Sequence, residues 1–248
     1  MDVVPPDWYK NWFGNEYLTV YAHRDEAEAE DLIKLIHRST KLTAGARILD
    51  LCCGQGRHAL RLAEMGYNVI GLDLSRTLLQ VAKFRRTPTQ KANFVQADMR
   101  FLPAVQSFDL ILNLFTSFGY FEKDQENQAV LDQFNLVLRP DGFFVFDYLN
   151  TDHVRSNLVP SHSDRVGDCF IETERKITRD LVQKKITIHK NGVKAVFYES
   201  VKMYKPDEIK KMLHRSGLEI FDIFGDYKGN DFNPSMPRLL IIGKKKVN

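Results

Sequence analysis

Residues 47–58 read Arg-Ile-Leu-Asp-Leu-Cys-Cys-Gly-Gln-Gly-Arg-His. The apolar run at 47–51 predicts a buried strand, and the segment from Gly56 to Gly66 predicts the helix that follows it. Gly54 and Gly56 lie between the two, where they allow a tight turn and let the backbone approach a ligand with no Cβ in the way. A strand, a glycine turn and a helix in this order predict one unit of an α/β fold.

The same alternation of short apolar runs and helix-period segments continues to residue 147. Ser75 is the expected N-cap of one of the helices, because its hydroxyl can accept a hydrogen bond from the first helical turn. This alternation predicts a doubly wound, mostly parallel sheet that helices cover on both faces. We expect strands at 68–73, 92–97, 108–112 and 143–147 and helices at 75–86 and 124–138, the second of which ends before Arg139-Pro-Asp-Gly142.

The pattern changes between residues 166 and 204, where apolar and polar residues alternate with a period of two. Asn191-Gly192 lies between two such runs and is a strong hairpin signal. We therefore expect a small antiparallel β insertion after the fifth strand. A helix at 206–216 and strands at 219–224 and 238–243 are expected to follow it, and a helix at 25–38 to precede the first strand. The expected division is an N-terminal aromatic lid and helix at 1–45, a core at 46–150, the insertion at 151–204, and a segment completing the core at 205–248.

Composition excludes several classes of protein. Hydrophobic residues make up 44% and charged residues 27% of the 248-residue chain, as in an ordinary globular enzyme. The net charge of +3 is too small to argue for a nucleic-acid partner, which needs clustered Lys and Arg. No stretch reaches the length of a membrane span, and the three cysteines match neither a disulfide framework nor a zinc site. We expect a cytoplasmic monomer or homodimer with no metal and no membrane partner.

Acidic side chains end three consecutive predicted strands. Asp50 is costly to bury unless it is hydrogen-bonded, Asp73 could accept both hydroxyls of a ribose, and Asp98 could accept from an adenine amino group. In an open α/β sheet, ligands bind at the carboxyl ends of the strands. Gly54-x-Gly56-x-x-Ala59 also satisfies the dinucleotide fingerprint, so these residues alone leave a nicotinamide cofactor open.

The chain resembles the class I S-adenosylmethionine-dependent methyltransferases. The resemblance rests on residues 48–58 and 66–75 and on three later segments, and its order and spacing cover roughly Ala46 to Tyr148. The later segments are Val95-Gln-Ala-Asp-Met99, Phe108-Asp-Leu-Ile-Leu112 and Leu138-Arg-Pro-Asp-Gly-Phe143. One departure is Cys52, which stands where the family usually has the first glycine of its loop. Because cysteine is small we expect binding to survive, and we expect no positive φ at this position.

This resemblance implies a seven-stranded Rossmann-like sheet whose last strand is antiparallel, with S-adenosylmethionine bound at its edge. It places the glycine loop under the methionine part of the cofactor, Asp73 on the ribose, and Asp98 with Met99 on the adenine. Tyr21 and Arg24 could contact the methionine end, where an arginine can pair a carboxylate through two hydrogen bonds. The expected cofactor-binding residues are Tyr21, Arg24, Asp50, Cys52, Gly54, Gly56, Asp73, Leu74, Asp98, Met99 and Asn113.

A finer resemblance, to the small-molecule N-methyltransferases, rests on the insertion and on the aromatic N-terminal segment around Trp8 and Trp12. Those rings either pack on the sheet edge or form a lid over the ligand. A general base is needed only if the acceptor arrives protonated, and the candidates by position are Tyr120, Glu122 and His153.

The sequence therefore predicts an enzyme that transfers a methyl group from S-adenosylmethionine to a small acceptor, nitrogen before oxygen. An RNA or protein methyltransferase and a nicotinamide-dependent oxidoreductase are the alternatives, as is a chain that binds the cofactor without catalysis.

Overall fold

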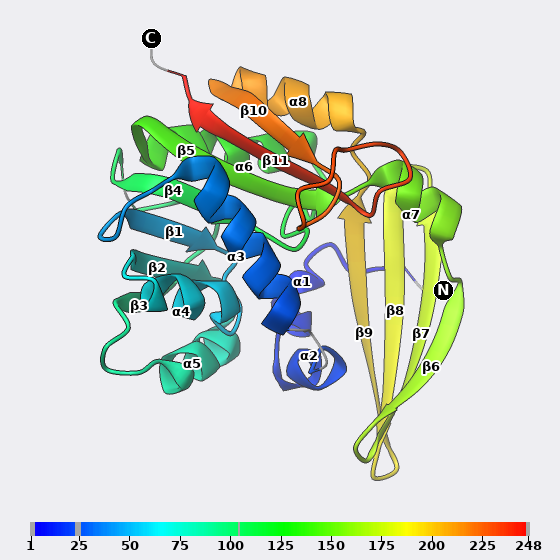
Figure 1. Ribbon diagram of the computed structural model, residues 1–248. Coiled ribbons are helices and arrows are strands. Elements are labelled where there is room, and N and C mark those ends of the chain that lie inside the picture. The colour runs from blue at the N-terminus through cyan, green and yellow to red at the C-terminus, as the bar shows by residue number, and fades with distance from the viewer. Residues whose placement is uncertain (1–2, 23–25, 104, 247–248) are drawn as a thin grey trace.

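The computed structural model describes residues 3–22, 26–103 and 105–246. Its central sheet has seven strands in the order β10-β11-β5-β4-β1-β2-β3, and β11 runs antiparallel to both of its neighbours (Figure 1). The predicted α/β class, the seven strands and the antiparallel last strand are confirmed. The strands are β1 (Arg47–Leu51), β2 (Asn68–Asp73), β3 (Ala92–Gln96), β4 (Phe108–Asn113), β5 (Leu138–Leu149), β10 (Leu218–Phe224) and β11 (Arg238–Lys245).

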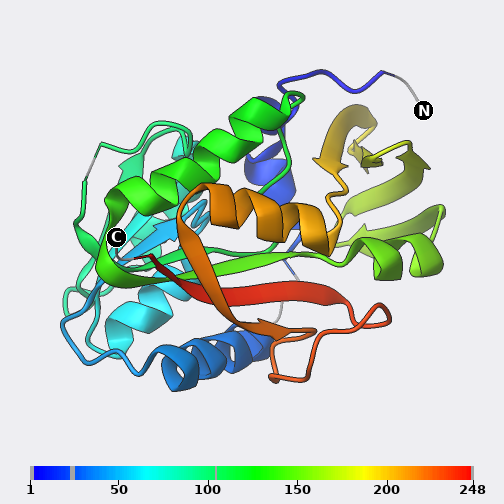
Figure 2. The same ribbon diagram turned by 90° about the horizontal axis from the view of Figure 1, so that it is seen from above.

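Helices cover both faces of this sheet, as Figure 2 shows from above. The helices α6 (Asp124–Val137) and α8 (Pro206–Arg215) pack on one face, whereas α3 (Glu26–Thr40), α4 (Arg57–Glu64) and α5 (Arg76–Arg85) cover the other. Each face has its own apolar core, because side chains alternate across a strand: Leu49 belongs to the first core and Ile48 to the second. Ser75 caps α5 as expected, with its Oγ accepting from the backbone N–H of Leu78.

A second sheet of four antiparallel strands stands beside the carboxyl edge of the first (Figure 1). Its strands are β6 (Ser161–Val166), β7 (Cys169–Thr178), β8 (Leu181–Lys190) and β9 (Val193–Lys202). The predicted hairpin at Asn191-Gly192 joins β8 to β9, with Lys190 paired to Val193. The short helix α7 (Thr151–Asn157), which the sequence did not predict, leads from β5 into this sheet.

The predicted start of the fifth strand at Phe143 is wrong, because β5 begins at Leu138. Leu138 pairs with Phe108 and the register then shifts, so that Leu110 pairs with Phe143. Asp141 has a φ of 59°, so the chain bulges within the strand instead of leaving it.

Two short helices, α1 (Tyr9–Trp12) and α2 (Asn15–Val20), lie between the two sheets (Figure 1). The indole of Trp12 packs against Phe197 of β9, with ring centroids 5.1 Å apart. On the other side, Ser75 Oγ donates to the backbone carbonyl of Phe13 at 2.5 Å. The aromatic N-terminal segment therefore bridges the four-stranded sheet and the carboxyl edge of the main sheet.

Two further features are absent from the described residues. In that part of the chain no helix is both long and apolar enough to span a membrane. Nor does it contain a group of three or more His, Cys, Asp or Glu side chains arranged to hold a metal ion.

Candidate active site

A cavity of about 310 Å³ lies where the two sheets and the N-terminal helices meet. Its floor is formed by the carboxyl ends of β1, β2 and β4 and the loop after β3, the edge at which ligands bind in open α/β sheets. Its roof is formed by rings from α1 and α2 and by side chains of β8 and β9. One continuous space therefore joins the predicted cofactor residues to the aromatic segment.

The glycine turn forms one wall of the cavity and is fixed by Asp73 at the end of β2. The backbone N–H groups of Gly54 and Ser75 donate to the two oxygens of the Asp73 carboxylate, each at 2.8 Å. Burial raises the pKa of Asp73, while these backbone hydrogen bonds oppose the rise. Each oxygen keeps a further lone pair, so the carboxylate can still accept from ligand hydroxyls.

Cys52 has a φ of 61°, so our expectation that this position needs no left-handed backbone is wrong. The turn fixes this conformation, because Cys53 donates its N–H to the carbonyl of Leu72 and accepts from Gly56. A non-glycine residue in this region stores strain of about 1–3 kcal/mol. The thiol lines the cavity and lies 3.5 Å from the sulfur of Met99.

Asp50 is buried in β1, and its side chain reaches the cavity. Its Oδ2 atom is inaccessible to solvent and, among the described residues, has no hydrogen-bond partner. Burial, followed by the nearby charge of Asp73, raises the pKa of Asp50 to about 7. A buried carboxylate oxygen without a donor is costly and is the natural partner of a cationic ligand group.

Asp98 also lines the cavity, but it has a partner that sequence reasoning missed. Arg100 donates to both carboxylate oxygens, with its NH2 nitrogen 2.6 Å from Oδ2, and also reaches Glu126. Burial would raise the pKa of Asp98, but these hydrogen bonds and the Arg100 charge lower it overall. The two-residue spacing of Asp98 and Arg100 was the available sequence signal.

The other predicted cofactor residues divide into two groups. Leu74 and Tyr21 line the cavity, and the Tyr21 hydroxyl donates to Glu199 of β9 at 2.8 Å. Gly56 and Asn113 lie outside the lining: Gly56 packs beneath the turn, and Asn113 is fully buried, donating to the carbonyl of Ser117. Arg24 lies outside the described residues.

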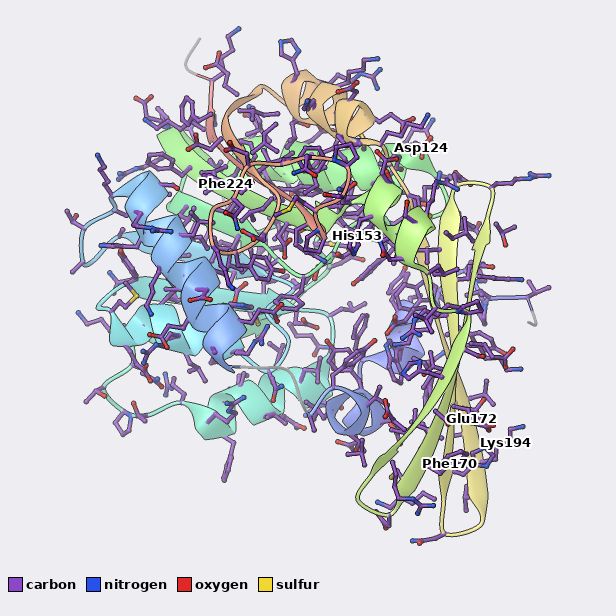
Figure 3. All side chains as sticks on the ribbon, turned by 45° about the vertical axis from the view of Figure 1, so that its right-hand side comes forward. Asp124, His153, Phe170, Glu172, Lys194 and Phe224 are labelled. Atoms are coloured by element: carbon purple, nitrogen blue, oxygen red, sulfur yellow. The ribbon has the colours of Figure 1, made fainter. Side chains whose placement is uncertain are left out.

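Only Tyr120 of the three candidate bases lies at the cavity. Burial raises the pKa of its phenol well above the ordinary value. Glu122 is exposed, and His153 on α7 hydrogen-bonds through Nδ1 to the carbonyl of Ser235 at 2.8 Å (Figure 3). Neither of these two residues lines the cavity.

A buried ionic network behind the cavity was also missed. Asp147 of β5 is fully buried, and its carboxylate accepts from Arg238 Nε at 2.8 Å and from the Tyr227 hydroxyl and the Phe115 N–H at 2.7 Å each. Phe115 and Thr116, which line the cavity after β4, both have positive φ, at 57° and 61°. The Asp147 carboxylate thus holds a strained loop in place, and its main partner is 91 positions away.

Comparison with known proteins agrees with this architecture. Residues 48–142 match a family model described as a methyltransferase domain. The chain is 26% identical to a glycine/sarcosine N-methyltransferase of Parasynechococcus marenigrum, over 85% of this chain and 75% of that one. It is 34% identical to a dTDP-3-amino-3,6-dideoxy-alpha-D-glucopyranose N,N-dimethyltransferase of Streptomyces fradiae, over 48% and 45% of the two chains.

The fold has a solved counterpart in an S-adenosylmethionine-dependent methyltransferase from Clostridium acetobutylicum. The TM-score is 0.82 at 22% identity, covering 94% of this chain and 99% of that one. The nicotinamide alternative that the glycine fingerprint left open gains no support. The matched methyltransferase domain, the seven-stranded sheet and the acids at its carboxyl edge support the assignment of this chain to the class I S-adenosylmethionine-dependent methyltransferases.

Proposed function

We propose that this enzyme methylates a nitrogen atom of a small molecule. The observation that carries the proposal is one continuous cavity that both the strand-end carboxylates and the aromatic rings line. Relatives whose names give glycine, sarcosine and an amino sugar as nitrogen acceptors support it. We further propose that residues 46–150 and 205–248 hold the cofactor, while 1–45 and 151–204 enclose the acceptor.

The residues at the strand ends fit the cofactor. The partnerless Asp50 oxygen suits the ammonium of its methionine part, and the Asp73 carboxylate suits the ribose hydroxyls. Asp98, with Met99 beside it, would face the adenine, and Leu74 and the Gly54 turn would complete this end. Tyr21 and Cys52 lie toward the aromatic end and would border the reacting part of the ligand.

S-Adenosylmethionine supplies an activated methyl group, which an acceptor nitrogen takes with its lone pair as the carbon–sulfur bond breaks. The chain's own task is to hold the acceptor in line and to exclude water, which can lower a barrier by about 7–11 kcal/mol. Tyr120 stays protonated near neutral pH because its pKa is raised, so it acts as a hydrogen-bonding wall and not as an ionised base. The proton that the nitrogen loses would pass to water.

Calorimetric titration with S-adenosylmethionine, S-adenosylhomocysteine and NAD tests the cofactor. Micromolar binding of the first two and none of NAD is expected. A panel of small amines and alcohols, analysed by mass spectrometry for a gain of one methyl group, then tests the acceptor. Methylated alcohols without methylated amines would overturn the nitrogen assignment.

An RNA or protein acceptor is the competing function. The roof of rings and β-strands over a cavity of about 310 Å³ favours a small acceptor. Methylation of RNA, together with an affinity for RNA that falls steeply as the salt concentration rises, would favour an RNA acceptor over a small one.

A further inference from the structure

The roof of the cavity carries one carboxylate, that of Glu199, among apolar and aromatic side chains. Glu199 lies on β9, and it lines the cavity together with Val201 of the same strand and Val182 of β8. Successive side chains of a strand alternate between faces, so Glu199 and Val201 point the same way. The Glu199 side chain is 23% exposed, which is low for a glutamate, since glutamates mostly lie at the protein surface. Because Glu199 lines the cavity, a ligand there can reach it.

One oxygen of this carboxylate is fully engaged. Trp12 Nε1 donates to Oε1 at 2.7 Å, and the Tyr21 hydroxyl donates to the same atom at 2.8 Å. Lys184 Nζ of β8 forms an ion pair with Oε2 at 3.8 Å, a separation longer than a hydrogen bond, and donates to the Tyr21 hydroxyl at 2.5 Å. The two donors fix the orientation of the carboxylate and leave Oε2 able to accept a strong hydrogen bond.

Aromatic rings surround this end of the cavity. Trp8 lies with its ring centroid 4.9 Å from that of Tyr120, and Phe13 lies 5.1 Å from Tyr17. All four rings line the cavity. Aromatic faces attract cations and bind apolar groups at the same time, so the surroundings of Glu199 suit an organic cation.

We propose that Glu199 and these rings bind the ammonium group of an amine acceptor that has an apolar body. Before methyl transfer the ammonium passes one proton to Oε2 of Glu199, which frees the nitrogen lone pair, and Glu199 returns the proton to water. The inference rests on the proposed function and names the acceptor class. An acceptor with an apolar body is unlike glycine, which the name of one relative gives as its acceptor.

The competing explanation is that Glu199 only ties the N-terminal helices to β9 through Trp12 and Tyr21. The Glu199→Gln variant separates this structural role from ammonium binding. The glutamine side-chain carbonyl can still accept from Trp12 and Tyr21, but the negative charge is lost. Glu172→Gln is the matched control, because Glu172 lies on β7 of the same sheet and does not line the cavity (Figure 3). Its partner is the half-exposed His189. Both variants remove one carboxylate from the same sheet.

Benzylamine and benzyl alcohol probe the site as a cation and a neutral molecule of the same shape. Each is titrated by calorimetry into the full chain saturated with S-adenosylhomocysteine, at a pH where the amine is protonated. We expect the ammonium to bind about 10- to 100-fold more tightly than the alcohol, as a charge-assisted hydrogen bond provides. Glu172→Gln should keep this preference and Glu199→Gln should lose it, with the affinity for S-adenosylhomocysteine unchanged in both.

Equal binding of the two probes, or a preference that survives Glu199→Gln, would overturn the inference. A loss of S-adenosylhomocysteine affinity in Glu199→Gln would also overturn it, because Glu199 would then serve the cofactor or the closure of the site. Turnover separates this inference from the proposed function. Methylation of glycine in preference to benzylamine contradicts the inference alone, whereas a charge preference in binding without methylation of any amine contradicts the proposed function alone.

Discussion

The affinity for the cofactor should depend on pH through Asp50. Its pKa is raised to about 7, and its Oδ2 lacks a donor among the described residues. An ammonium prefers the ionised carboxylate, so affinity should follow the ionised fraction of Asp50. With a pKa of about 7, that fraction rises from roughly 3% at pH 5.5 to about 50% at pH 7.0. The dissociation constant of S-adenosylhomocysteine should therefore fall about 15-fold over this range, or ~1.6 kcal/mol.

The assay is calorimetric titration at four pH values between 5.5 and 7.0, a range in which an α-ammonium stays protonated. Asp50→Asn should bind more weakly at pH 7.0 and show a flat profile. Asp98→Asn is the control, because the lowered pKa of Asp98 keeps it ionised throughout, so this variant should keep the slope. A flat profile in the wild type would refute the reasoning. A slope that survives Asp50→Asn would show that another group causes the pH dependence.

The pH dependence of the free energy of unfolding provides an independent check on Asp50. Its folded-state pKa lies above its unfolded value, so the folded chain holds the proton more tightly. The contribution of Asp50 to the free energy of unfolding is present below about pH 4 and is lost as the pH rises toward 7. Asp50→Asn should therefore flatten this part of the stability profile of the ligand-free chain, as measured by urea unfolding.

Three other substitutions test the rest of the site. Asp73→Ala should weaken binding of both S-adenosylmethionine and its product by about 1–3 kcal/mol in calorimetry, and an unchanged dissociation constant in a folded variant would show that the ribose is placed wrongly. Cys52→Gly should keep the melting temperature and cofactor affinity, because it relieves a left-handed residue, whereas the β-branched Cys52→Val should lower both; equal behaviour of the two would contradict the backbone argument. Arg238→Leu leaves the Asp147 carboxylate buried beside an apolar group, so it should lower the free energy of unfolding in urea by about 3–5 kcal/mol. A loss below about 1 kcal/mol would mean that the carboxylate does not need this partner.

The strands and helices of the core could be predicted because their signals are local. Residues 68–73 form β2 as predicted, and Asn191-Gly192 forms the hairpin between β8 and β9. An apolar run bounded by glycine or aspartate needs no distant partner to be recognised. The start of β5 was missed because Arg139-Pro-Asp-Gly142 interrupts the apolar run, and the pairing of Leu138 with Phe108 becomes visible only in the assembled sheet.

The cavity could be predicted in part. Asp73 and Asp98 lie at strand ends that the sequence identifies, and the topology brings those ends to one edge. Glu199 gave no signal, because a glutamate in a period-two strand normally faces solvent. Its inward direction depends on Trp12 and Tyr21, which lie 187 and 178 positions away.

Asp50 and Asp147 show most clearly what separates a binding residue from a structural one. Both are aspartates within central strands, both are almost completely buried, and in the sequence each follows a run of apolar residues. Arg238, Tyr227 and the Phe115 N–H satisfy Asp147. Asp50, by contrast, lines the cavity, and one of its oxygens has no donor among the described residues. A satisfied buried carboxylate stabilises the fold, and an unsatisfied one is tolerated where a ligand completes it. Since the partners of Asp147 come from distant parts of the chain, the distinction becomes visible only once the strands are assembled.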